Sequence, residues 1–523
     1  MVSYQYPKTV FPRKFTYIKV VLMKKKLIAF FTALCCIAMT ACSSAGAIST
    51  YTISLDSMPK NFDPQVASGD NELMVLTNIY DGLFEYRDGQ IVPNVCESYT
   101  ISPDGLTYTF KLCSDSTFFL SKKEQIPVTS HDFAFALERV LDSRTHSPYY
   151  NDFSHIDSIS TPDSNTLVIS LNHKDSDFLN KLCSPAAYPC NKDFFTSTNG
   201  AYGLRVNDIL SNGPYTINYL ADDGSYATII RVDGNEKAIS RIRISLADEE
   251  SDIVTEYNND KVSGFFSDGN NISNLSGTVF SYENQNFNMV FNPDVKSLSG
   301  KYTRGALAKF AFAMENSGAN LEAINQSHSF FNSSVILSGQ PVTELIGDYI
   351  PSYMEKDAKP LLMEGLAAVE LTQMENLTVL IPEDISYKVI AENINQLWQK
   401  ELGLFFTLEF IPNSEIAARV SKGDFDIAFL SSTPTINNPA DILQNYKGYG
   451  GDIDMHISML AQSYLSQNDI LTAVKYAHND IIEAAYIVPM CTDTSHYIHK
   501  DYFKGVEINP FGNIVNLKYA TVK

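Results

Sequence analysis

Alternation of apolar and polar residues is clearest at residues 106–112. Leu106, Tyr108, Phe110 and Leu112 alternate with two threonines and a lysine, so the apolar side chains share one face of an extended strand. The preceding Ser-Pro-Asp-Gly at residues 102–105 has proline at a central turn position and glycine at its close. The pattern therefore predicts a half-buried β-hairpin.

The apolar spacing upstream of this hairpin is typical of a helix. The residues that recur at this spacing are Leu73, Leu76, Ile79, Tyr80 and Leu83. Because Asp63 precedes Pro64, helical backbone is disfavoured there and the helix is expected to begin at about Asn71. Gly82 can supply the positive φ that ends it.

Further elements follow from the same patterns. Strands are predicted at residues 51–55, 166–171, 242–246, 377–382 and 404–410, and helices at 134–141, 304–316 and 387–399. Thr129 or Ser130 can cap the helix at 134–141, because a hydroxyl oxygen can accept a hydrogen bond from a first-turn amide. The strand, helix and strand at residues 377–410 predict a βαβ-like unit.

Length and charge restrict the function classes. A chain of 523 residues exceeds what one hydrophobic core organises, so two or three domains are expected. The net charge is −21, but Met1 to Cys42 holds seven Lys and Arg and no acids, which leaves 32 basic and 60 acidic residues, or −28, in the rest. This balance argues against nucleic acid as a partner and favours a surface that tolerates cationic or zwitterionic ligands.

The N-terminal residues predict secretion. Three lysines at 24–26 precede an apolar run, Leu27 to Met39, and Thr40-Ala41-Cys42 then fits a lipobox in which Cys42 is lipidated. An uncleaved membrane anchor is the alternative, but a run of 13 residues is short for spanning a bilayer. Residues 1–22 precede the natural start of such a signal, which is consistent with an upstream start codon.

Other candidate sites give weak signals. Cys183 and Cys190 are close enough in sequence to form a disulfide, and buried thiols are an equally open alternative. His496 and His499 are interpreted as surface histidines because no third metal ligand has a suitable spacing. The acidic run at 248–252 could bind calcium, but a solvated charge run is favoured, and the glycines at 448–451 indicate a loop. No metal site, cofactor or enzymatic activity is predicted, since GxSxG, HExxH and P-loop motifs are absent.

Several short motifs together resemble the signature of the family 5 extracellular solute-binding proteins. They are Tyr80-Asp81-Gly82-Leu83, Pro93, Glu97-Ser98, Ser102-Pro103-Asp104-Gly105 and Tyr108-Thr109-Phe110, and the segments at 501–506 and 510–512 resemble the closing segment of that family. The family contains oligopeptide-, dipeptide- and nickel-binding lipoproteins of ABC importers. The resemblance implies an α/β, two-lobed periplasmic-binding-protein-like fold of type II, in the large cluster with an extra subdomain.

The resemblance also implies a division of the chain. We expect a signal peptide at 1–42, a tether at 43–50, the first part of lobe I at 51–88, the extra subdomain at 89–199, the second part of lobe I at 200–285, lobe II at 286–488 and the return to lobe I at 489–523. The segments that cross between the lobes are expected near Asn288 and Val488.

The same resemblance points to a ligand-binding loop within residues 423–439. The ligand-binding residues it implies are Phe429, Ser432, Thr433 and Thr435. The tryptophan usual in peptide-binding relatives falls at Ser432 and the ammonium-binding aspartate at Thr435. A threonine hydroxyl is a weaker, neutral acceptor than a carboxylate. Either this loop no longer binds the peptide amino terminus, or its residues are ordinary loop residues and another acid serves the cleft.

The implied function is an extracellular substrate-binding lipoprotein of an ABC importer, which captures a solute between its lobes and delivers it to a membrane permease. Peptides are the leading solute because their amides and carbonyls can pair with strand edges; another small solute stays open. The expected partners are the ABC permease and ATPase complex and the membrane, reached through the lipid on Cys42 at the outer face of the cytoplasmic membrane. A sensory or interaction lipoprotein that lost or changed solute binding is the alternative, and a hydrolase is third.

Overall fold

The computed structural model describes residues 49–523, apart from 88–89, 122–123, 176, 248–251, 268–271, 273, 312–323, 338, 384, 435–436, 445–450 and 461–466. The predicted signal peptide with Cys42, most of the acidic run and Thr435 lie outside the described residues. Residues 50–523 form one compact unit. Within the described ranges, no helix combines the length and apolar character that a membrane span requires.

Lobe I is built on parallel and antiparallel strands of the main sheet. In spatial order they are β10 (Tyr215–Leu220), β11 (Tyr226–Arg231), β12 (Arg241–Leu246), β1 (Thr50–Leu55) and β13 (Gly264–Ser267). β1 is parallel to both of its neighbours. Helix α2 (Asp70–Ile79) packs on the face of β1 that carries Tyr51 and Ile53, and α7 (Ile253–Asn258) packs with Phe265 in a separate cluster.

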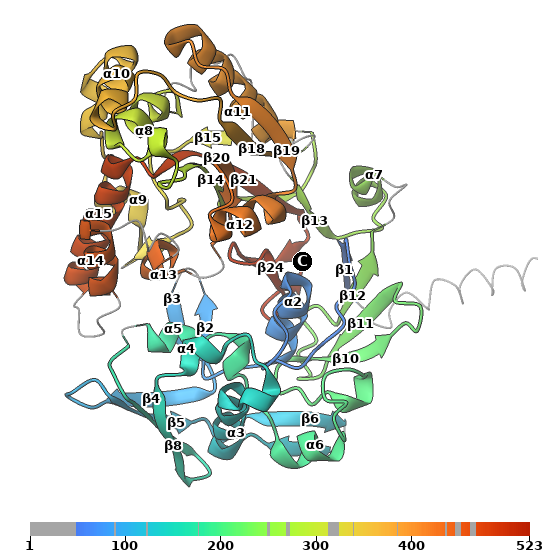
Figure 1. The fold of residues 1–523 in the computed structure, drawn as a ribbon. Coiled ribbons are helices and arrows are strands. Elements are labelled where there is room, and N and C mark those ends of the chain that lie inside the picture. Colours follow the sequence, from blue (N-terminus) through green and yellow to red (C-terminus); the bar gives the residue numbers. More distant parts are fainter. Residues whose placement is uncertain are drawn as a thin grey trace, which may run out of the picture. The chain divides into compact units, whose positions relative to one another are not determined.

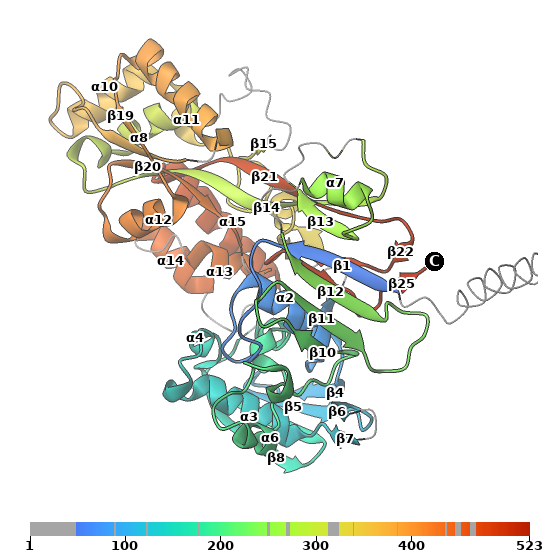
Figure 2. The ribbon, with the colours of Figure 1, turned by 90° about the vertical axis from the view of Figure 1, so that its right-hand side faces the viewer.

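Two long strands connect lobe I to lobe II. β14 (Thr278–Phe291) and β21 (Ile487–His499) are antiparallel along nearly their whole length, and Asn288 pairs with Pro489. β14 runs from the strands of lobe I to those of lobe II, and β21 runs back in the opposite direction (Figure 2). The predicted crossing segments near Asn288 and Val488 are therefore paired neighbours.

Lobe II continues the same sheet through β20 (Ile427–Ser432), β18 (Thr378–Pro382) and β19 (Thr407–Ile411). β18 and β19 are parallel and are joined by α11 (Ile385–Leu397) and a π-helical turn, which confirms the βαβ-like unit. The helices α8 (Lys301–Ala308), α10 (Ala358–Ala368), α12 (Asn413–Lys422) and α15 (Gln467–Ala484) complete the lobe. The only tryptophan of the chain, Trp398, is fully buried in its core.

The extra subdomain has a core of its own. Its sheet has the order β4 (Cys96–Ile101), β5 (Thr107–Leu112), β9 (Thr166–Leu171) and β8 (Ile156–Asp163), and α3 (Ser130–Leu141) packs with this sheet (Figure 1). The predicted hairpin is confirmed, since β4 and β5 are antiparallel and Tyr108, Phe110 and Leu112 are buried. Thr129 caps α3 in a capping box with Asp132.

Shorter elements complete the fold. The strands are β2 (Phe84–Arg87), β3 (Gln90–Pro93), β6 (Thr117–Ser121), β7 (Glu124–Pro127), β15 (Ile324–Gln326), β16 (Ile336–Leu337), β17 (Gln340–Pro341), β22 (Phe503–Lys504), β23 (Glu507–Asn509), β24 (Ile514–Asn516) and β25 (Thr521–Val522), and the helices are α4 (Tyr150–Phe153), α5 (Phe178–Lys181), α6 (Lys192–Ser197), α9 (Val342–Ile346), α13 (Pro439–Gln444) and α14 (Gly451–Leu460).

Three local predictions need comment. Helix α2 ends at Ile79, and Gly82 does not have a positive φ, so its predicted role was wrong. A Cβ on Gly82 would lie 3.0 Å from the ring of Tyr188, so the glycine allows this ring to pack closely against the backbone. Cys183 and Cys190 are free thiols, which favours the second alternative for that pair. His499 is buried in the sheet rather than on the surface, where its ring stacks on Phe280.

Candidate functional site

The strand directions define where the two lobes face each other. β13 and β14 are both antiparallel to β21, so the parallel strands of lobe I run toward lobe II. β20 is antiparallel to β14 and parallel to β18, so the strands of lobe II run toward lobe I. The carboxyl ends of both sets therefore meet beside the crossing strands. In open α/β sheets this edge is where ligands bind.

A cavity of about 530 Å³ lies at the lobe I side of this edge. Its walls come from the ends of β1 and β13, the first turn of α2, the start of α7 and the loop before β24. The residues that line it are Ser54, Leu55, Asp56, Ser57, Gly69, Asp70, Asn71, Glu72, Met74, Ala247, Ile253, Phe265, Phe266 and Asn513. Phe265 of β13 packs with α7, and the next residue, Phe266, packs with the cluster that contains α2, so the cavity opens between helices on opposite faces of the sheet.

Three carboxylates give this cavity a negative character. Asp70 and Glu72 occupy the first turn of α2, and Asp56 follows β1. Glu72 accepts a hydrogen bond from the Lys60 amide at 2.9 Å, and Asp56 accepts one from Asn71 at 3.2 Å. Desolvation by the surrounding protein, followed by repulsion from Asp56 and Glu72, raises the pKa of Asp70 above its usual value.

Asn513 connects the cavity to the crossing strands. Its backbone is left-handed, with φ of 51°. The hydroxyl of Tyr282, on β14, donates to Asn513 Oδ1 at 2.6 Å. This bond occupies the carbonyl end of the amide, so the Nδ2 donor is the end of Asn513 that is available to a solute.

The end of β20 forms the lobe II side of the edge. β18 pairs with β20 only at its first residues, and beyond that point Asn413 takes the place of a strand partner. Its side chain accepts from the Ser431 amide at 3.1 Å and donates to the Ser431 carbonyl at 3.0 Å. This double contact fixes the chain that leads to Ser432 and Thr433.

The predicted site residues do not all lie at this edge. Ser432 is half-buried and Thr433 is exposed, both next to the carboxyl end of β20. Phe429 is fully buried in the lobe II core, where its ring packs against Phe287, so it supports this strand from inside and does not reach the edge in this structure. Contact of these side chains with a solute stays a prediction, and Thr435 lies outside the described residues.

The register of the crossing strands shifts between the lobes. β13 pairs with β21 as far as His496, and β20 pairs with β14 from Asn286 onward. Between these points the register of β14 shifts after Glu283. The Glu283 carboxylate accepts hydrogen bonds from the Ser333 amide and the Thr492 hydroxyl, each at 2.8 Å. Tyr282 thus contacts lobe I through Asn513, whereas the next residue contacts lobe II.

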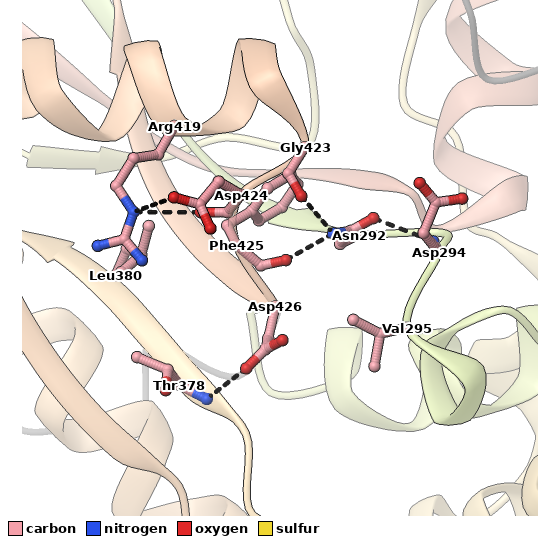
Figure 3. A pocket seen from close by; sticks show the side chains of 10 residues that line it. All are labelled: Asn292, Asp294, Val295, Thr378, Leu380, Arg419, Gly423, Asp424, Phe425 and Asp426. Atoms are coloured by element: carbon pink, nitrogen blue, oxygen red, sulfur yellow. Dashed lines mark hydrogen bonds and ion pairs between the residues drawn. The ribbon is translucent and has the colours of Figure 1, made fainter.

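A second cavity, of about 370 Å³, lies at the opposite end of the lobe II strands (Figure 3). Asn292 donates to the Gly423 and Phe425 carbonyls, at 3.1 and 2.6 Å, and Asp426 accepts from the Thr378 amide at 2.8 Å. Arg419 forms an ion pair with Asp424. Asn292, Arg419 and Asp426 thus bond to neighbouring residues of the cavity wall. The cavity is at the amino ends of β18 and β20, away from the crossing strands.

Metal ligation has no support in the described part of the chain, which contains no group of three or more His, Cys, Asp or Glu suited to a metal ion. His496 Nδ1 instead forms a 2.8 Å hydrogen bond with the Ser281 hydroxyl. Sequence reasoning did not select Asp56, Asp70 or Asn513. The available signal was the predicted strand at residues 51–55 followed by a helix, since ligands bind at the carboxyl ends of strands in open α/β sheets.

The sequence comparisons give one consistent result. The model of the bacterial extracellular solute-binding proteins, family 5 (middle), matches residues 90–453. The oligopeptide-binding protein AliB of Streptococcus pneumoniae is 29% identical over 202 residues, which cover 35% of this chain and only 31% of AliB. The dipeptide-binding protein DppE of Bacillus subtilis is 22% identical over 499 residues, which cover 88% of this chain and 90% of DppE.

Solved structures show the same fold. HbpA2 from Haemophilus parasuis superposes with a TM-score of 0.75 at 18% sequence identity, covering 91% of this chain and 100% of that one. The expected two-lobed α/β fold is confirmed.

Proposed function

Because the chain belongs to family 5 of the bacterial extracellular solute-binding proteins, we propose that it captures peptides between its two lobes and delivers them to the permease of an ABC importer. The proposal rests on one observation above all: the 530 Å³ cavity lies at the carboxyl ends of the lobe I strands, facing the end of β20 across the crossing strands. The names of AliB and DppE favour a peptide as the solute.

Capture would work through the crossing strands. Among the described strands of the main sheet, only β14 and β21 belong to both lobes, and these strands carry the register shift next to Glu283. A change in lobe separation there leaves both cores intact. The solute favours the closed arrangement to the extent that it contacts both lobes better when closed. On the lobe II side, Ser432, Thr433 and Thr435 are the proposed contacts.

The remaining features of the proposal concern location and chemistry. We infer that residues 1–42 are a signal peptide and that lipid on Cys42 anchors the protein to the outer face of the cytoplasmic membrane, facing the periplasm in a Gram-negative cell. The proposed lobe and subdomain boundaries are those predicted from the sequence. The solute is bound and released unchanged, without enzymatic turnover.

Two measurements test this function. Native mass spectrometry of protein purified without denaturation should identify a co-purified peptide. Calorimetry with a peptide pool, with sugars and with nickel chelates should show binding of the peptide pool alone. Binding of none of these three classes would contradict a role in peptide import.

The threonine at position 435 favours a second candidate, a sensory or interaction lipoprotein that lost or changed solute binding. The Thr435→Asp variant separates the two. A gain in peptide affinity would indicate a degenerate peptide clamp, and loss of a native solute other than a peptide would indicate a repurposed pocket; either outcome would support the second candidate. Unchanged binding of a native peptide would support peptide capture.

A further inference from the structure

We propose that the lobe I cavity binds the amino-terminal ammonium group of the solute, with Asp70 and Asp56 as its carboxylate partners and Asn513 as the donor to the first carbonyl oxygen. This inference rests on the proposed function and gives it a specific subsite. It also places the acid of the cleft on lobe I, at the start of α2, rather than on the loop that contains position 435.

Asp70 is the central group because its carboxylate makes no hydrogen bond or ion pair within the described residues, whereas Glu72 accepts one hydrogen bond and Asp56 accepts two, from the Ser57 hydroxyl and the Asn71 amide. The neighbouring Gly512 leaves room for it. A Cβ on Gly512, which has φ of 83°, would lie 3.3 Å from Asp70 Oδ1. Gly512 therefore lies against the Asp70 carboxylate, and its neighbour Asn513 lines the same cavity.

The charges of the cavity select a cation. The amino end of α2 carries a partial positive charge equivalent to roughly half an elementary charge, which one carboxylate would offset. Three carboxylates line the cavity, and no lysine or arginine is among its described lining residues. The excess negative charge attracts an ammonium group and repels a carboxylate or phosphate.

A second, independent observation comes from Ser54. The Ser54 hydroxyl oxygen is buried at the cavity wall and has no hydrogen-bond partner among the described residues. A buried hydroxyl without a partner is costly unless a ligand or water satisfies it. Ser54 and Asn513 thus add two neutral polar residues to the lining of the cavity.

This arrangement matches the start of a peptide. The first residue of a peptide carries an ammonium group, a side chain and a carbonyl oxygen. The cavity offers carboxylates for the ammonium group, the partly exposed Phe266 ring for the side chain and an amide donor for the carbonyl oxygen. A peptide whose amino group is acetylated keeps the side chain and carbonyl but loses the cation. It therefore isolates the contribution of the carboxylates.

The test uses the full mature chain and a random-sequence tetrapeptide pool, once with free amino groups and once N-acetylated, with binding measured by calorimetry. The wild type should bind the free pool about tenfold more tightly than the acetylated one, as expected for a charge-assisted contact. Asp70→Asn should lose most of this discrimination, and Asp56→Asn part of it. Asp294→Asn, which removes the same charge from the distal cavity, should keep it.

The outcomes separate the subsite from the function. Discrimination retained by both Asp70→Asn and Asp56→Asn, or equal binding of both pools by the wild type, would overturn the ammonium subsite while leaving peptide capture in place. Binding of neither pool by the wild type would overturn the proposed function, and the subsite with it. Far-ultraviolet circular dichroism of each variant confirms that α2 and its lobe stay folded.

Discussion

The phenol oxygen of Tyr86 accepts a hydrogen bond of 2.6 Å from Nδ2 of Asn437, although 351 positions separate the two residues. Tyr86 lies on β2, and Asn437 lies between β20 and α13 of lobe II. Asn437 Oδ1 also accepts from the Ile336 amide at 2.6 Å, so its amide is fixed within lobe II. The contact thus ties the β2–β3 hairpin to the loop that follows β20.

Replacing Tyr86 by phenylalanine should shift the protein toward a larger lobe separation. The change removes one partly buried side-chain hydrogen bond, worth about 1 kcal/mol, and keeps the ring. The population with the present separation should fall about fivefold relative to the wider one. Small-angle scattering should show an increased radius of gyration. Tyr99→Phe, on the exposed face of β4, is the matched control and should leave the scattering curve unchanged.

The fold could be predicted to a large extent because its signals are local. Alternation at Tyr108 and Phe110 is enough to define a strand with one buried face, and the cap at Thr129 requires only the next three residues. The role of Gly82 could not be predicted, since it depends on Tyr188, which is distant in sequence.

The site was less accessible to sequence reasoning. Phe429 belongs to a strand with neighbours on both edges and buried residues on both faces, so its alternation cannot distinguish core from cleft. Asp70 and Gly512 come together from opposite ends of the chain. No local sequence pattern indicates that these two residues lie close together.

Arg139→Met should destabilise the protein by about 3 kcal/mol. The Arg139 guanidinium forms a buried bidentate pair with Asp63 and donates to Gln65 Oε1 at 2.6 Å, which joins α3 of the extra subdomain to the segment before α2. The methionine would leave the buried Asp63 carboxylate unpaired. Chemical denaturation followed by circular dichroism should show the loss in free energy of unfolding.

The exposed pair of Arg144 and Asp142 provides the control for this effect. Arg144→Met should leave the free energy of unfolding nearly unchanged, because a solvated ion pair contributes little. If both variants had the same free energy of unfolding, the Asp63 contact would not connect the subdomain to lobe I. The double variant Arg139→Met with Asp63→Asn should recover part of the loss, since it removes the unpaired charge.

Glu283→Ala should loosen the lobe II side of the crossing strands. The Ser333 amide loses its carboxylate acceptor, and a partly exposed bond of this kind is worth about 1 kcal/mol, so hydrogen exchange at Ser333 should become about fivefold faster. The Ser352 amide, which donates to Glu483 Oε2 at 2.8 Å in the same lobe, is an internal control. Equal acceleration at Ser352 would indicate global destabilisation instead of a local change.

Stability should fall in acid because of a buried histidine. His478, on α15, is fully buried, stacks on Phe331 and has no partner for Nε2 among the described residues. Burial lowers its pKa from 6.5 to about 4. The unfolded chain therefore takes up a proton at about pH 6.5, whereas the folded protein resists protonation until about pH 4. The free energy of unfolding should drop by about 3 kcal/mol across this window through His478 alone.

His478→Phe isolates this contribution, because a phenyl ring preserves the aromatic packing with Phe330 and Phe331 and cannot be protonated. Urea denaturation at pH 7 and at pH 4.5, followed by the fluorescence of Trp398 in the same lobe, measures the stability of each protein. The variant should lose less stability than the wild type between the two pH values, by about 2 to 3 kcal/mol. An equal loss of stability in the two proteins would show that other groups, chiefly carboxylates, determine the acid sensitivity.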